Sequence, residues 1–575
     1  MSVGLHIDRV GALIQDEQWD LARVMSQSGL RLYPEEPQLL RMSLIASYRL
    51  GDLYEALESS RQLVALSDEP RDLYNFGTLA LEFNRPKEAR AALERVLELQ
   101  PENLSARANL VAACSELGNL DRAIALSDGV EFNQHPATVV ANFVCNLATA
   151  YRDAGMPKQA MEFYAHAMAL SDGWHPVSAS NRLYAANFDP GLGAFEIETL
   201  HREWGDFVSR PHRHKDTSYR SNAPLSRHPR IGFLSGDFRR HSVAYFLEPV
   251  LEALQGHAEL VALDNSPHHD EVTDRLRERM DGWVSIRALD DEAAANAIEA
   301  LELDILIDLS GHTAHNRLPL MARRLARKQM CYLGYPNTAG LSQVDVRLVD
   351  PYCDPESSTW RGTETLSRVE TGFLAYRGPE CEVVRQKQGA QLTFGSFNTP
   401  AKVNEALLKV WAEALKAHPQ AKLLLKNKAY GSKVVQKRVR QVLAAAGVEI
   451  SRIEFRTHTA SLKAHLETYN EVDVALDTFP YQGTTTTCEA LFMGVPVVSL
   501  CGERHASRVA HTLAHQAGEE WVRCVDTTEA FVKEVSRCVG LTSEREQRTP
   551  KLGNDEGKIA QRAARIAAAL LEVTT

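Results

Sequence analysis

An alanine that follows a short turn recurs at a nearly constant interval along the first 175 residues of the chain. Successive marker alanines are separated by 34, 33, 34 and 37 residues. The longest interval indicates a short insertion around Gly129 to Pro136. The turns and their alanines are Gly51–Ala56, Asn84–Ala89, Gly118–Ala123 and Gly155–Ala160, and a more divergent copy ends at Ala22.

This repeat constrains the architecture of the first third of the chain. A period of about 34 residues, with a small residue where two helices cross and a proline closing units at Pro34, Pro70 and Pro101, is the tetratricopeptide pattern. Each unit is a helix pair that cannot bury its apolar face alone, so neighbours stack into a superhelix with a concave surface. We therefore predict a tetratricopeptide superhelix over residues 1–175. We expect its groove to dock a protein or peptide, but repeat count alone leaves a spacer or a self-association surface equally open.

The next segment, residues 176–228, breaks the period. We predict one or two helices between Pro190 and Val208, followed by an exposed connector. The basic stretch Arg210 to Lys215 is expected to be a solvated linker. His212 and His214 lie two residues apart without nearby cysteine or carboxylate partners, so a metal site is not expected there.

Behind this connector, short apolar runs alternate with amphipathic stretches, which is typical of parallel, doubly wound sheets. We predict two Rossmann-like lobes, residues 229–385 and 386–545, followed by a C-terminal helix within residues 546–575. The strands expected in the first lobe are Arg230–Ser235, Leu260–Asp264, Trp283–Ile286, Ile305–Leu309, Gln329–Leu333 and Val346–Val349. Those expected in the second are Leu392–Phe397, Leu423–Lys426, Ile453–Phe455, Val472–Leu476 and Val495–Leu500, and the final helix spans Gly557–Leu571.

The composition of the chain limits which classes of binding partner and which cellular compartment are expected. The chain has 64 Lys and Arg against 75 Asp and Glu, a formal charge of −11, so nucleic acid and anionic membranes have no bulk electrostatic support as partners. The nine cysteines are scattered without a Cys-x-x-Cys pair, which indicates reduced thiols rather than a disulfide framework or a zinc knuckle. No apolar run approaches the roughly 18 to 20 residues that a spanning helix needs, and the start lacks a signal-peptide pattern. We expect a cytoplasmic protein.

Two adjacent lobes of this kind form a cleft, because open parallel sheets bind ligands beyond the carboxyl ends of their strands. No Gly-x-Gly-x-x-Gly follows an expected strand, which disfavours nicotinamide and flavin binding. In the second lobe, the strand ending at Leu476 leads into Gly483, and threonines 484–487 then open a helix. Free backbone N–H groups and the positive end of the helix dipole favour a phosphate at such a place, whereas a threonine there can also be merely a helix cap.

The hydroxyls of Thr485 and Thr486 are expected to add donors to this anion site. Glu489, one turn into the helix, is placed to accept hydrogen bonds from a ribose diol. We therefore predict the donor half of a nucleotide-sugar transferase with glycosyltransferase-B architecture.

Tetratricopeptide repeats fused to two such lobes, with these stretches, resemble the protein O-linked N-acetylglucosamine (O-GlcNAc) transferases, specifically their short bacterial homologues. The resemblance implies a helical superhelix followed by the α/β lobes of a glycosyltransferase-B fold. It also implies an inverting transfer of N-acetylglucosamine from UDP-GlcNAc to Ser and Thr hydroxyls of proteins docked by the repeats. No cofactor or metal is then expected, and no Asp-x-Asp triplet that would suit a metal on the diphosphate occurs in the sequence.

Two motifs carry the expected catalytic residues. The stretch from Gly232 through Asp237 to His241 matches the family's first strand and the loop with its active-site histidine, and an imidazole there suits proton transfer or hydrogen bonding to a sugar. The segment Gly395 to Val403 matches the family's nucleotide-diphosphate segment, in which Lys402 would neutralise charge on the departing phosphate.

The resemblance assigns further residues to the nucleotide sugar. Phe397, Asn398 and Thr399 lie in the Lys402 segment, where Thr399 replaces a family glutamine and puts one phosphate contact in doubt. The complete expected nucleotide-sugar set is Leu333, Gly334, Phe397, Asn398, Thr399, Lys402, Ala460, His465, Gly483, Thr484, Thr485, Thr486 and Glu489. In this set the Leu333 loop lines the sugar pocket, while Ala460 and His465 contact the uracil.

Some positions have two interpretations. His312 and His315 lie beyond a strand of the first lobe and are expected to have an acceptor-side or structural role rather than a metal role. Ser507 and Arg508 resemble the family's last cleft motif, although Arg508 is equally compatible with a helix-surface charge. Glu299 stands where animal members carry a second active-site histidine, so that role is not transferred.

Two other functions remain open from the sequence. One is a non-catalytic scaffold whose cleft only senses a nucleotide sugar. The other keeps the fold and changes the chemistry, with glucose as donor or an asparagine amide as acceptor. The sequence does not name the acceptor protein, and it leaves open whether the general base is His241, a phosphate oxygen or water.

Overall fold

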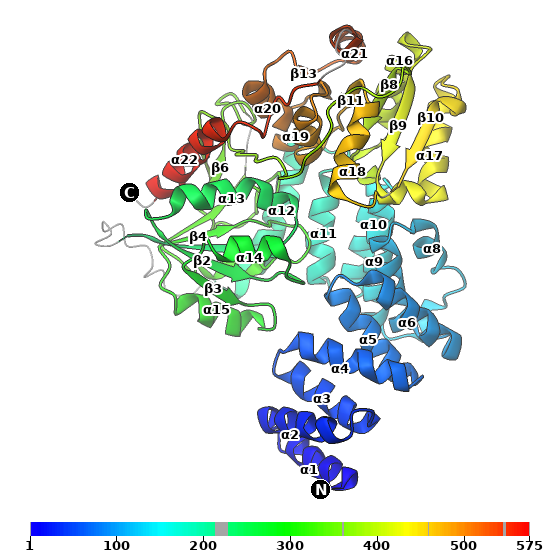
Figure 1. Cartoon of the computed structure of the whole chain (residues 1–575), viewed down its shortest axis with the longest axis vertical. Helices are drawn as coiled ribbons and strands as arrows, with labels where there is room; N and C mark the ends of the chain where they lie inside the picture. The colour runs from blue at the N-terminus through cyan, green and yellow to red at the C-terminus, as the bar shows by residue number, and fades with distance from the viewer. Residues whose placement is uncertain (1, 213–227, 359–361, 458, 544–547, 574–575) are drawn as a thin grey trace.

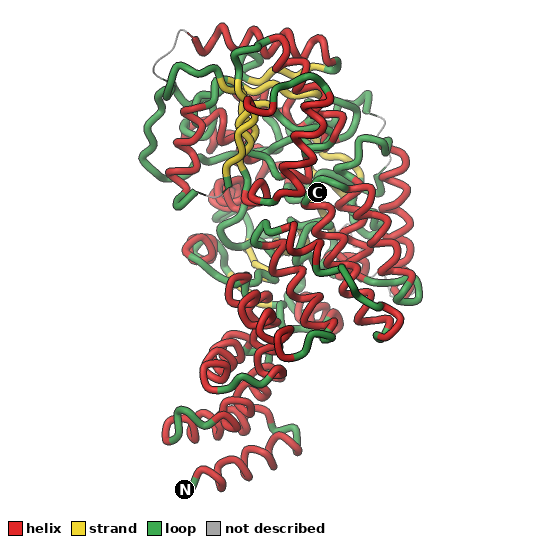
Figure 2. Tube along the Cα trace, turned by 90° about the vertical axis from the view of Figure 1, so that its right-hand side faces the viewer, coloured by secondary structure: helices red, strands yellow, loops and turns green. Residues whose placement is uncertain are grey.

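The computed structural model describes residues 2–212, 228–358, 362–457, 459–543 and 548–573. A helical array extends from the N-terminus and leads into two α/β lobes (Figure 1). Figure 2 shows the array as a stack of helices beneath the part of the molecule that contains the strands. The predicted fold class, a tetratricopeptide superhelix followed by two Rossmann-like lobes, is confirmed.

Five antiparallel helix pairs form the array, and each marker alanine lies in the second helix of its pair. All five marker alanines have no exposed surface, because each sits where its helix crosses a neighbour. The fourth pair is irregular: α8 is short, and the 3-10 helix Phe132–Gln134 precedes α9, at the predicted insertion. The helices are α1 (Val3–Gln15), α2 (Trp19–Leu32), α3 (Pro37–Arg49), α4 (Leu53–Leu66), α5 (Pro70–Glu82), α6 (Pro86–Leu99), α7 (Leu104–Glu116), α8 (Leu120–Ala125), α9 (Ala137–Asp153) and α10 (Pro157–Ala169).

Two further helices connect the array to the lobes, α11 (Pro176–Ala186) and α12 (Ala194–Ser209). The sequence predicted only the range of α12. Helix α12 packs so tightly on the first lobe that a Cβ at Gly205 would lie 1.8 Å from the Gly340 carbonyl oxygen. Of the predicted basic linker, Arg210–His212 forms a 3-10 turn, and the rest lies outside the described residues.

The first lobe contains a seven-stranded parallel sheet in the order β3-β2-β1-β4-β5-β6-β7. The six predicted strands are present, and β7 is an additional edge strand. The strands are β1 (Arg230–Ser235), β2 (Glu259–Asp264), β3 (Gly282–Ser285), β4 (Ile305–Asp308), β5 (Lys328–Cys331), β6 (Val346–Val349) and β7 (Thr365–Arg368). The α-helices between them are α13 (Ser242–Leu254), α14 (Glu271–Arg277) and α15 (Asp291–Glu299).

The second lobe repeats this plan with a six-stranded parallel sheet in the order β10-β9-β8-β11-β12-β13. Its edge strand β13 was not predicted. The strands are β8 (Thr393–Ser396), β9 (Lys422–Lys426), β10 (Ile453–Arg456), β11 (Val474–Leu476), β12 (Val497–Leu500) and β13 (Val522–Val525). The helices are α16 (Glu405–Ala417), α17 (Lys433–Ala445), α18 (Leu462–Glu467), α19 (Thr485–Phe492), α20 (Val509–Ala517) and α21 (Thr528–Ser543).

The last helix, α22 (Glu556–Glu572), returns to the first lobe and lies beside α13 (Figure 1). Its buried face carries Ile559, Ala563, Ile566 and Leu570. The chain therefore crosses between the lobes twice, which ties the two lobes together. Within the described residues, no helix is both long and apolar enough to cross a membrane.

The repeat array also docks directly on the second lobe. The carboxylate of Asp121, at the start of α8, accepts hydrogen bonds from the backbone N–H groups of Lys433 (2.6 Å) and Val434 (2.7 Å). It thereby caps α17, whose own N-cap residue, Ser432, makes no side-chain cap bond. A Cβ at Gly118 would lie 2.8 Å from the backbone of Lys428, so the two surfaces are in close contact.

Candidate active site

Both sheets reverse their strand order at one point, and the loops that leave the strands there face a shared cavity. In the first lobe this switch lies between β1 and β4, and in the second it lies between β8 and β11. The cavity has a volume of about 680 Å³, within the range that small-molecule ligands occupy. Loops from all four strands line it, together with residues from the repeat array.

The loop after β11 is organised by a buried carboxylate. Asp477 accepts hydrogen bonds from the backbone N–H groups of Thr478 and Gly483, each at 2.8 Å, and from the Ser499 hydroxyl at 2.5 Å. Burial raises the pKa of Asp477 to about 6. A Cβ at Gly483 would lie 2.3 Å from the Thr486 hydroxyl, so this turn has no room for a side chain. The loop is therefore held in one shape before any ligand arrives.

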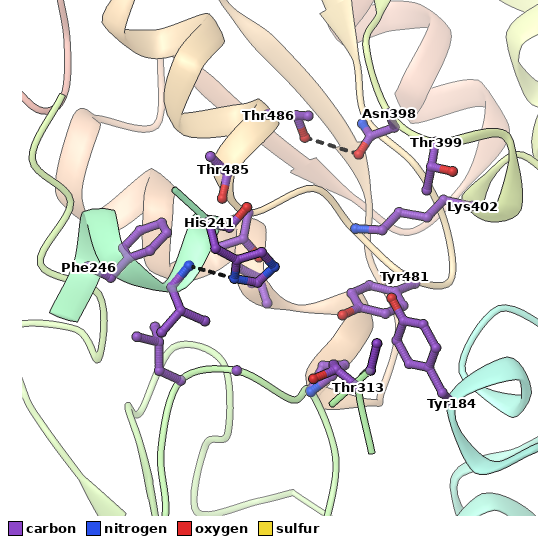
Figure 3. Close-up of a pocket in the computed structure, with 18 of the residues that line it drawn as sticks. Tyr184, His241, Phe246, Thr313, Asn398, Thr399, Lys402, Tyr481, Thr485 and Thr486 are labelled. Carbon is purple, nitrogen blue, oxygen red and sulfur yellow. Dashed lines mark hydrogen bonds between the residues drawn. The ribbon is translucent and has the colours of Figure 1, made fainter. Parts of the chain in front are cut away.

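Helix α19 begins at the end of this loop with an uncapped N-terminus. Its N-cap residue, Thr484, makes no side-chain hydrogen bond to the first turn. Thr484, Thr485 and Thr486 all line the cavity. The Thr486 hydroxyl donates to the Asn398 side-chain oxygen at 3.0 Å, which joins the two loops of the second lobe (Figure 3). Uncapped N–H groups and the helix dipole make this end suited to an anion.

Lys402 brings a positive charge to the same cavity. It follows β8, donates a hydrogen bond from Nζ to the Gln482 carbonyl oxygen at 2.8 Å, and lies with Nζ 4.0 Å from the Tyr481 ring centroid. Desolvation lowers the pKa of Lys402 to about 8, and the nearby Asp477 carboxylate opposes this shift. The ammonium group is therefore mostly protonated at neutral pH.

Three expected donor-site residues form a second group in the same lobe. The Nε2 atom of His465 lies 3.1 Å from a carboxylate oxygen of Glu489, and its Nδ1 atom is hydrogen-bonded to Lys426. The Phe397 ring lies beside His465, with centroids 5.9 Å apart, and below the Lys426 ammonium. This group places charge, a ring face and hydrogen-bonding groups side by side in the second lobe.

The predicted nucleotide-sugar residues are not all found in the cavity wall. Ala460 is exposed in the loop after β10, and Gly483, His465 and Glu489 support the site without lining the cavity. Those that do line it are Leu333, Gly334, Phe397, Asn398, Thr399, Lys402, Thr484, Thr485 and Thr486.

His241 reaches the cavity from the first lobe, as predicted for a residue just beyond β1 (Figure 3). It is the N-cap residue of α13: its Nδ1 atom accepts a hydrogen bond from the Val243 N–H at 3.4 Å and lies 3.5 Å from Asp237. Burial lowers the pKa of His241, although Asp237 opposes this shift. The imidazole is therefore mainly neutral at neutral pH.

The loop after β5 brings backbone against the cavity. Leu333 has a φ of 73°, and a Cβ at Gly334 would lie 1.7 Å from the Leu309 carbonyl oxygen. Only glycine fits this second position, so the loop is fixed against the end of β4.

His312 does not lie in the cavity. Its imidazole has no exposed surface, and its two nitrogens lie 2.9 Å from the Ser180 hydroxyl and 3.3 Å from the Ala339 carbonyl oxygen. The Trp204 ring packs across it at 4.4 Å between centroids. The expected acceptor-side role is therefore corrected to the structural one, because this histidine holds α11 and α12 against the first lobe.

His315 is exposed, next to Thr313 and Ala314 of the cavity wall, so its acceptor-side role stays a prediction. Glu299 lies at the end of α15, outside the cavity wall.

Residues of the predicted last cleft motif join the lobes. Arg508 donates to the carbonyl oxygens of Cys353 at 2.9 Å and Tyr352 at 3.1 Å, so it bridges the lobes rather than being an exposed helix-surface charge. Ser507 bonds within its own turn. The buried His505 imidazole lies 2.6 Å from an Asp354 carboxylate oxygen of the opposite lobe and also lines the cavity.

Several cavity residues were not singled out from the sequence. Glu116 and Arg152 come from repeat helices α7 and α9, and Tyr184 comes from α11. The Arg152 guanidinium lies 5.3 Å from the Tyr184 ring centroid, and Tyr184 packs against Tyr481 of the second lobe. Tyr481 stands inside the stretch that predicted the anion site. No local sequence pattern marks Glu116 and Arg152 as cavity residues, because they reach the cavity only when the repeat array docks on the lobes.

Comparisons with known proteins agree with this geometry. The model of glycosyl transferase family 41 matches residues 176–376 and 385–533, and a tetratricopeptide repeat model matches residues 80–136. The chain is 35% identical over 353 residues to a tomato (Solanum lycopersicum) protein named probable UDP-N-acetylglucosamine–peptide N-acetylglucosaminyltransferase SPINDLY. That match covers 60% of this chain and 38% of the relative.

A more distant relative is the Arabidopsis thaliana protein with the same enzyme name and the designation SEC, 28% identical over 308 residues, which are 50% of this chain and 31% of that protein. The chain thus spans well under half the length of these curated relatives. A solved structure of a mutant O-GlcNAc transferase from Thermobaculum terrenum is similar with a TM-score of 0.73 and 30% identity. This likeness covers 88% of this chain and 94% of that one. With the family model covering more than half of its length, the chain belongs to glycosyl transferase family 41.

Proposed function

We propose that this protein is an inverting glycosyltransferase that moves N-acetylglucosamine from UDP-GlcNAc to Ser and Thr hydroxyls of proteins, without a metal or other cofactor. One observation carries the proposal: the uncapped start of α19 and the Lys402 ammonium face His241 of the other lobe across a single cavity (Figure 3). The names of the family members that the chain resembles support the choice of donor and acceptor.

The second lobe is proposed to stabilise the leaving group. When the bond between the anomeric carbon and the β-phosphate oxygen breaks, negative charge develops on the diphosphate. The amides at the start of α19, the Thr485 hydroxyl and Lys402 meet this charge with groups that are already in place, while the Thr486 hydroxyl donates to Asn398. Glu489 and His465 would hold the ribose and base farther along the same lobe.

The first lobe is proposed to position the attacking hydroxyl. A proton on His241 Nδ1, facing Asp237, leaves Nε2 free to accept the hydroxyl proton as the oxygen attacks the anomeric carbon. The other tautomer, in which Nδ1 accepts from Val243, makes Nε2 a donor that orients the sugar. Either role requires a neutral imidazole, which the lowered pKa of His241 supplies.

The repeat array is proposed to deliver the acceptor protein. Glu116 and Arg152 bring it to the cavity edge, and a second hollow of about 280 Å³ lies along α7 and α9. Asn109, Asn142 and Asn146 line that hollow, and carboxamides can bond the N–H and C=O groups of an extended chain. A polypeptide bound there would lie on α7 and α9, the two helices that also supply Glu116 and Arg152 to the transferase cavity.

The experiment is transfer of labelled sugar to proteins of a cell extract, followed by mass spectrometry of the modified residue. We expect N-acetylglucosamine on Ser and Thr, from UDP-GlcNAc, undiminished by a chelator. Labelling from UDP-glucose or from another nucleotide sugar instead would overturn the donor, and a sugar on asparagine would overturn the acceptor. Tight UDP binding in calorimetry with no transfer to any protein would leave a nucleotide-sugar sensor and contradict the enzyme.

A further inference from the structure

Two cysteines and a histidine lie close together in the second lobe, behind the loop that joins β11 to α19. Cys501 directly follows β12, Cys524 lies in the neighbouring strand β13, and His511 comes from α20. Ser499 is the register partner of Cys524, so Cys501, two residues later, is on the same face of the sheet as Cys524. The chain separations of 10 and 13 residues match no metal-binding motif, so the sequence predicted only scattered thiols.

The geometry of this group is that of a ligand set. The two sulfur atoms and one imidazole nitrogen lie within 4.8 Å of one another. An ion at about 2.3 Å from each sulfur and about 2.0 Å from the nitrogen holds tetrahedral ligands at separations of roughly 3.5 Å, so the three atoms would have to draw together only modestly. All three residues are partly exposed, so a hydrated ion has access to them.

We propose that Cys501, His511 and Cys524 form a three-ligand site for a thiophilic transition metal ion, with Zn²⁺ as the reference ion and water as the fourth ligand. Two thiolates and one imidazole are the donor types that Zn²⁺ prefers, and hard cations such as Mg²⁺ are excluded by the sulfur ligands.

The site is distinct from the transferase cavity and touches it through one residue. The side-chain nitrogen of Gln482 lies 3.4 Å from Cys501 Sγ, and its side-chain oxygen accepts from the Ala510 N–H at 2.8 Å. The backbone carbonyl of the same glutamine accepts from Lys402. The proposed ion would thus join β12, β13 and α20 directly behind the loop that holds Lys402, with no contact to the diphosphate.

The test is metal binding by the reduced, full-length chain under anaerobic conditions, with Co²⁺ and Zn²⁺ alone as probes. We expect one Co²⁺ per chain, a thiolate-to-cobalt charge-transfer band, and displacement by one Zn²⁺. Cys501→Ser and Cys524→Ser should each weaken binding at least about 100-fold, since loss of a direct ligand exceeds the loss of a supporting one. The matched control is Cys381→Ser, which alters another partly exposed cysteine and should leave binding unchanged.

A second measurement avoids variants altogether. In the unmodified protein, Zn²⁺ should slow alkylation of Cys501 and Cys524, read by mass spectrometry, and leave Cys381 unaffected. Equal metal binding by all three variants, a cobalt spectrum without a thiolate band, or alkylation indifferent to Zn²⁺ would each overturn the site. None of these results depends on sugar transfer, so they stand apart from the proposed function.

Discussion

Each lobe presents a helix N-terminus at the switch point of its sheet, after β1 in the first lobe and after β11 in the second, but the two helix ends differ in their capping. In the first lobe, the imidazole of His241 closes the start of α13 by accepting the Val243 N–H. In the second lobe, Thr484 leaves the start of α19 without a side-chain cap. Both helix ends lie at the switch point of a parallel sheet and face one cavity.

Under the proposed function, this difference would let two similar α/β lobes supply two kinds of chemistry. In a capped helix, a backbone N–H group of the first turn already donates to a side chain. In α13 that side chain is His241, a titratable group that lines the cavity. An uncapped end keeps its donors for an anion. In the proposed mechanism, the residue at the cap position thus helps to distinguish the lobe that would bind the diphosphate from the lobe that would handle a proton or a hydroxyl.

The largest effect is expected when the capped end loses its side chain. His241→Ala should lower the rate of sugar transfer by about 10² to 10⁴, the usual contribution of a positioned acid or base, and destabilise α13 by about 1 kcal/mol through loss of the cap. Steady-state kinetics and thermal unfolding measure the two effects. His241→Asn is the matched variant, since asparagine restores the cap but cannot take up a proton. Recovery of transfer in that variant would exclude His241 as the general base and leave the cap or a hydrogen bond to the sugar as its role.

At the uncapped end, the charge of Lys402 is the next test. Lys402→Ala should reduce the turnover number by about 10² to 10³, because it removes a preorganised donor to the departing diphosphate. The control is Lys409→Ala, which alters an exposed lysine paired with Glu405 on α16 and should leave transfer unchanged. Near-normal turnover by Lys402→Ala would contradict the leaving-group role.

Making the uncapped end resemble the capped one should weaken nucleotide binding. Thr484→Asp places a capping carboxylate at the start of α19, where it competes for the amides and repels the diphosphate. We expect a ten- to hundredfold loss of UDP affinity by calorimetry, about the contribution of one hydrogen bond to a charged group. Thr484→Ser keeps a neutral hydroxyl and should bind UDP normally. Unchanged affinity in the aspartate variant would place the diphosphate elsewhere.

The pH dependence of UDP binding sharpens the same comparison. The pKa of Lys402 is lowered to about 8, so its ammonium is charged below that pH and neutral above it. UDP affinity should hold steady up to about pH 8 and then fall by at most tenfold per pH unit, with proton uptake on binding near pH 8. Calorimetry in buffers of different ionisation enthalpy measures both. Lys402→Ala should remove this dependence, and its persistence in the variant would assign it to another group.

The smallest effect is expected where the array caps the second lobe. Asp121→Ala removes the carboxylate from the start of α17 and should lower the free energy of unfolding by about 1 to 2 kcal/mol. Denaturant unfolding measures it, and the exposed Asp128→Ala serves as control. Sugar transfer to a short peptide should be unaffected, because Asp121 lies outside the cavity wall. Equal stability of the two variants would show that the docking contact contributes nothing.

The sequence predicted the features that arise from local patterns. The marker alanines revealed the superhelix because a repeating crossing point needs a repeating small residue. The central strands appeared as apolar runs because both faces of a parallel sheet are buried. The edge strands β7 and β13 escaped prediction because they are only partly covered, so their residues do not form a continuous apolar run.

What the sequence did not predict depends on docking between distant segments. Arg152 and Tyr184 enter the cavity only because the array packs on the lobes. Docking between distant segments also brings α22 back to the first lobe and places Cys501 beside Cys524. For His312 the sequence left an acceptor-side and a structural role open, and its burial by α11 and α12 favours the structural one.

The most direct test of the account is a crystal structure of the protein with UDP bound. We expect diphosphate oxygens within hydrogen-bonding distance of the backbone amides that open α19 and of Lys402 Nζ, with His241 facing the β-phosphate across the cavity. A diphosphate bound away from α19, or a helix end filled by the protein's own side chains, would contradict the division of roles between the two lobes.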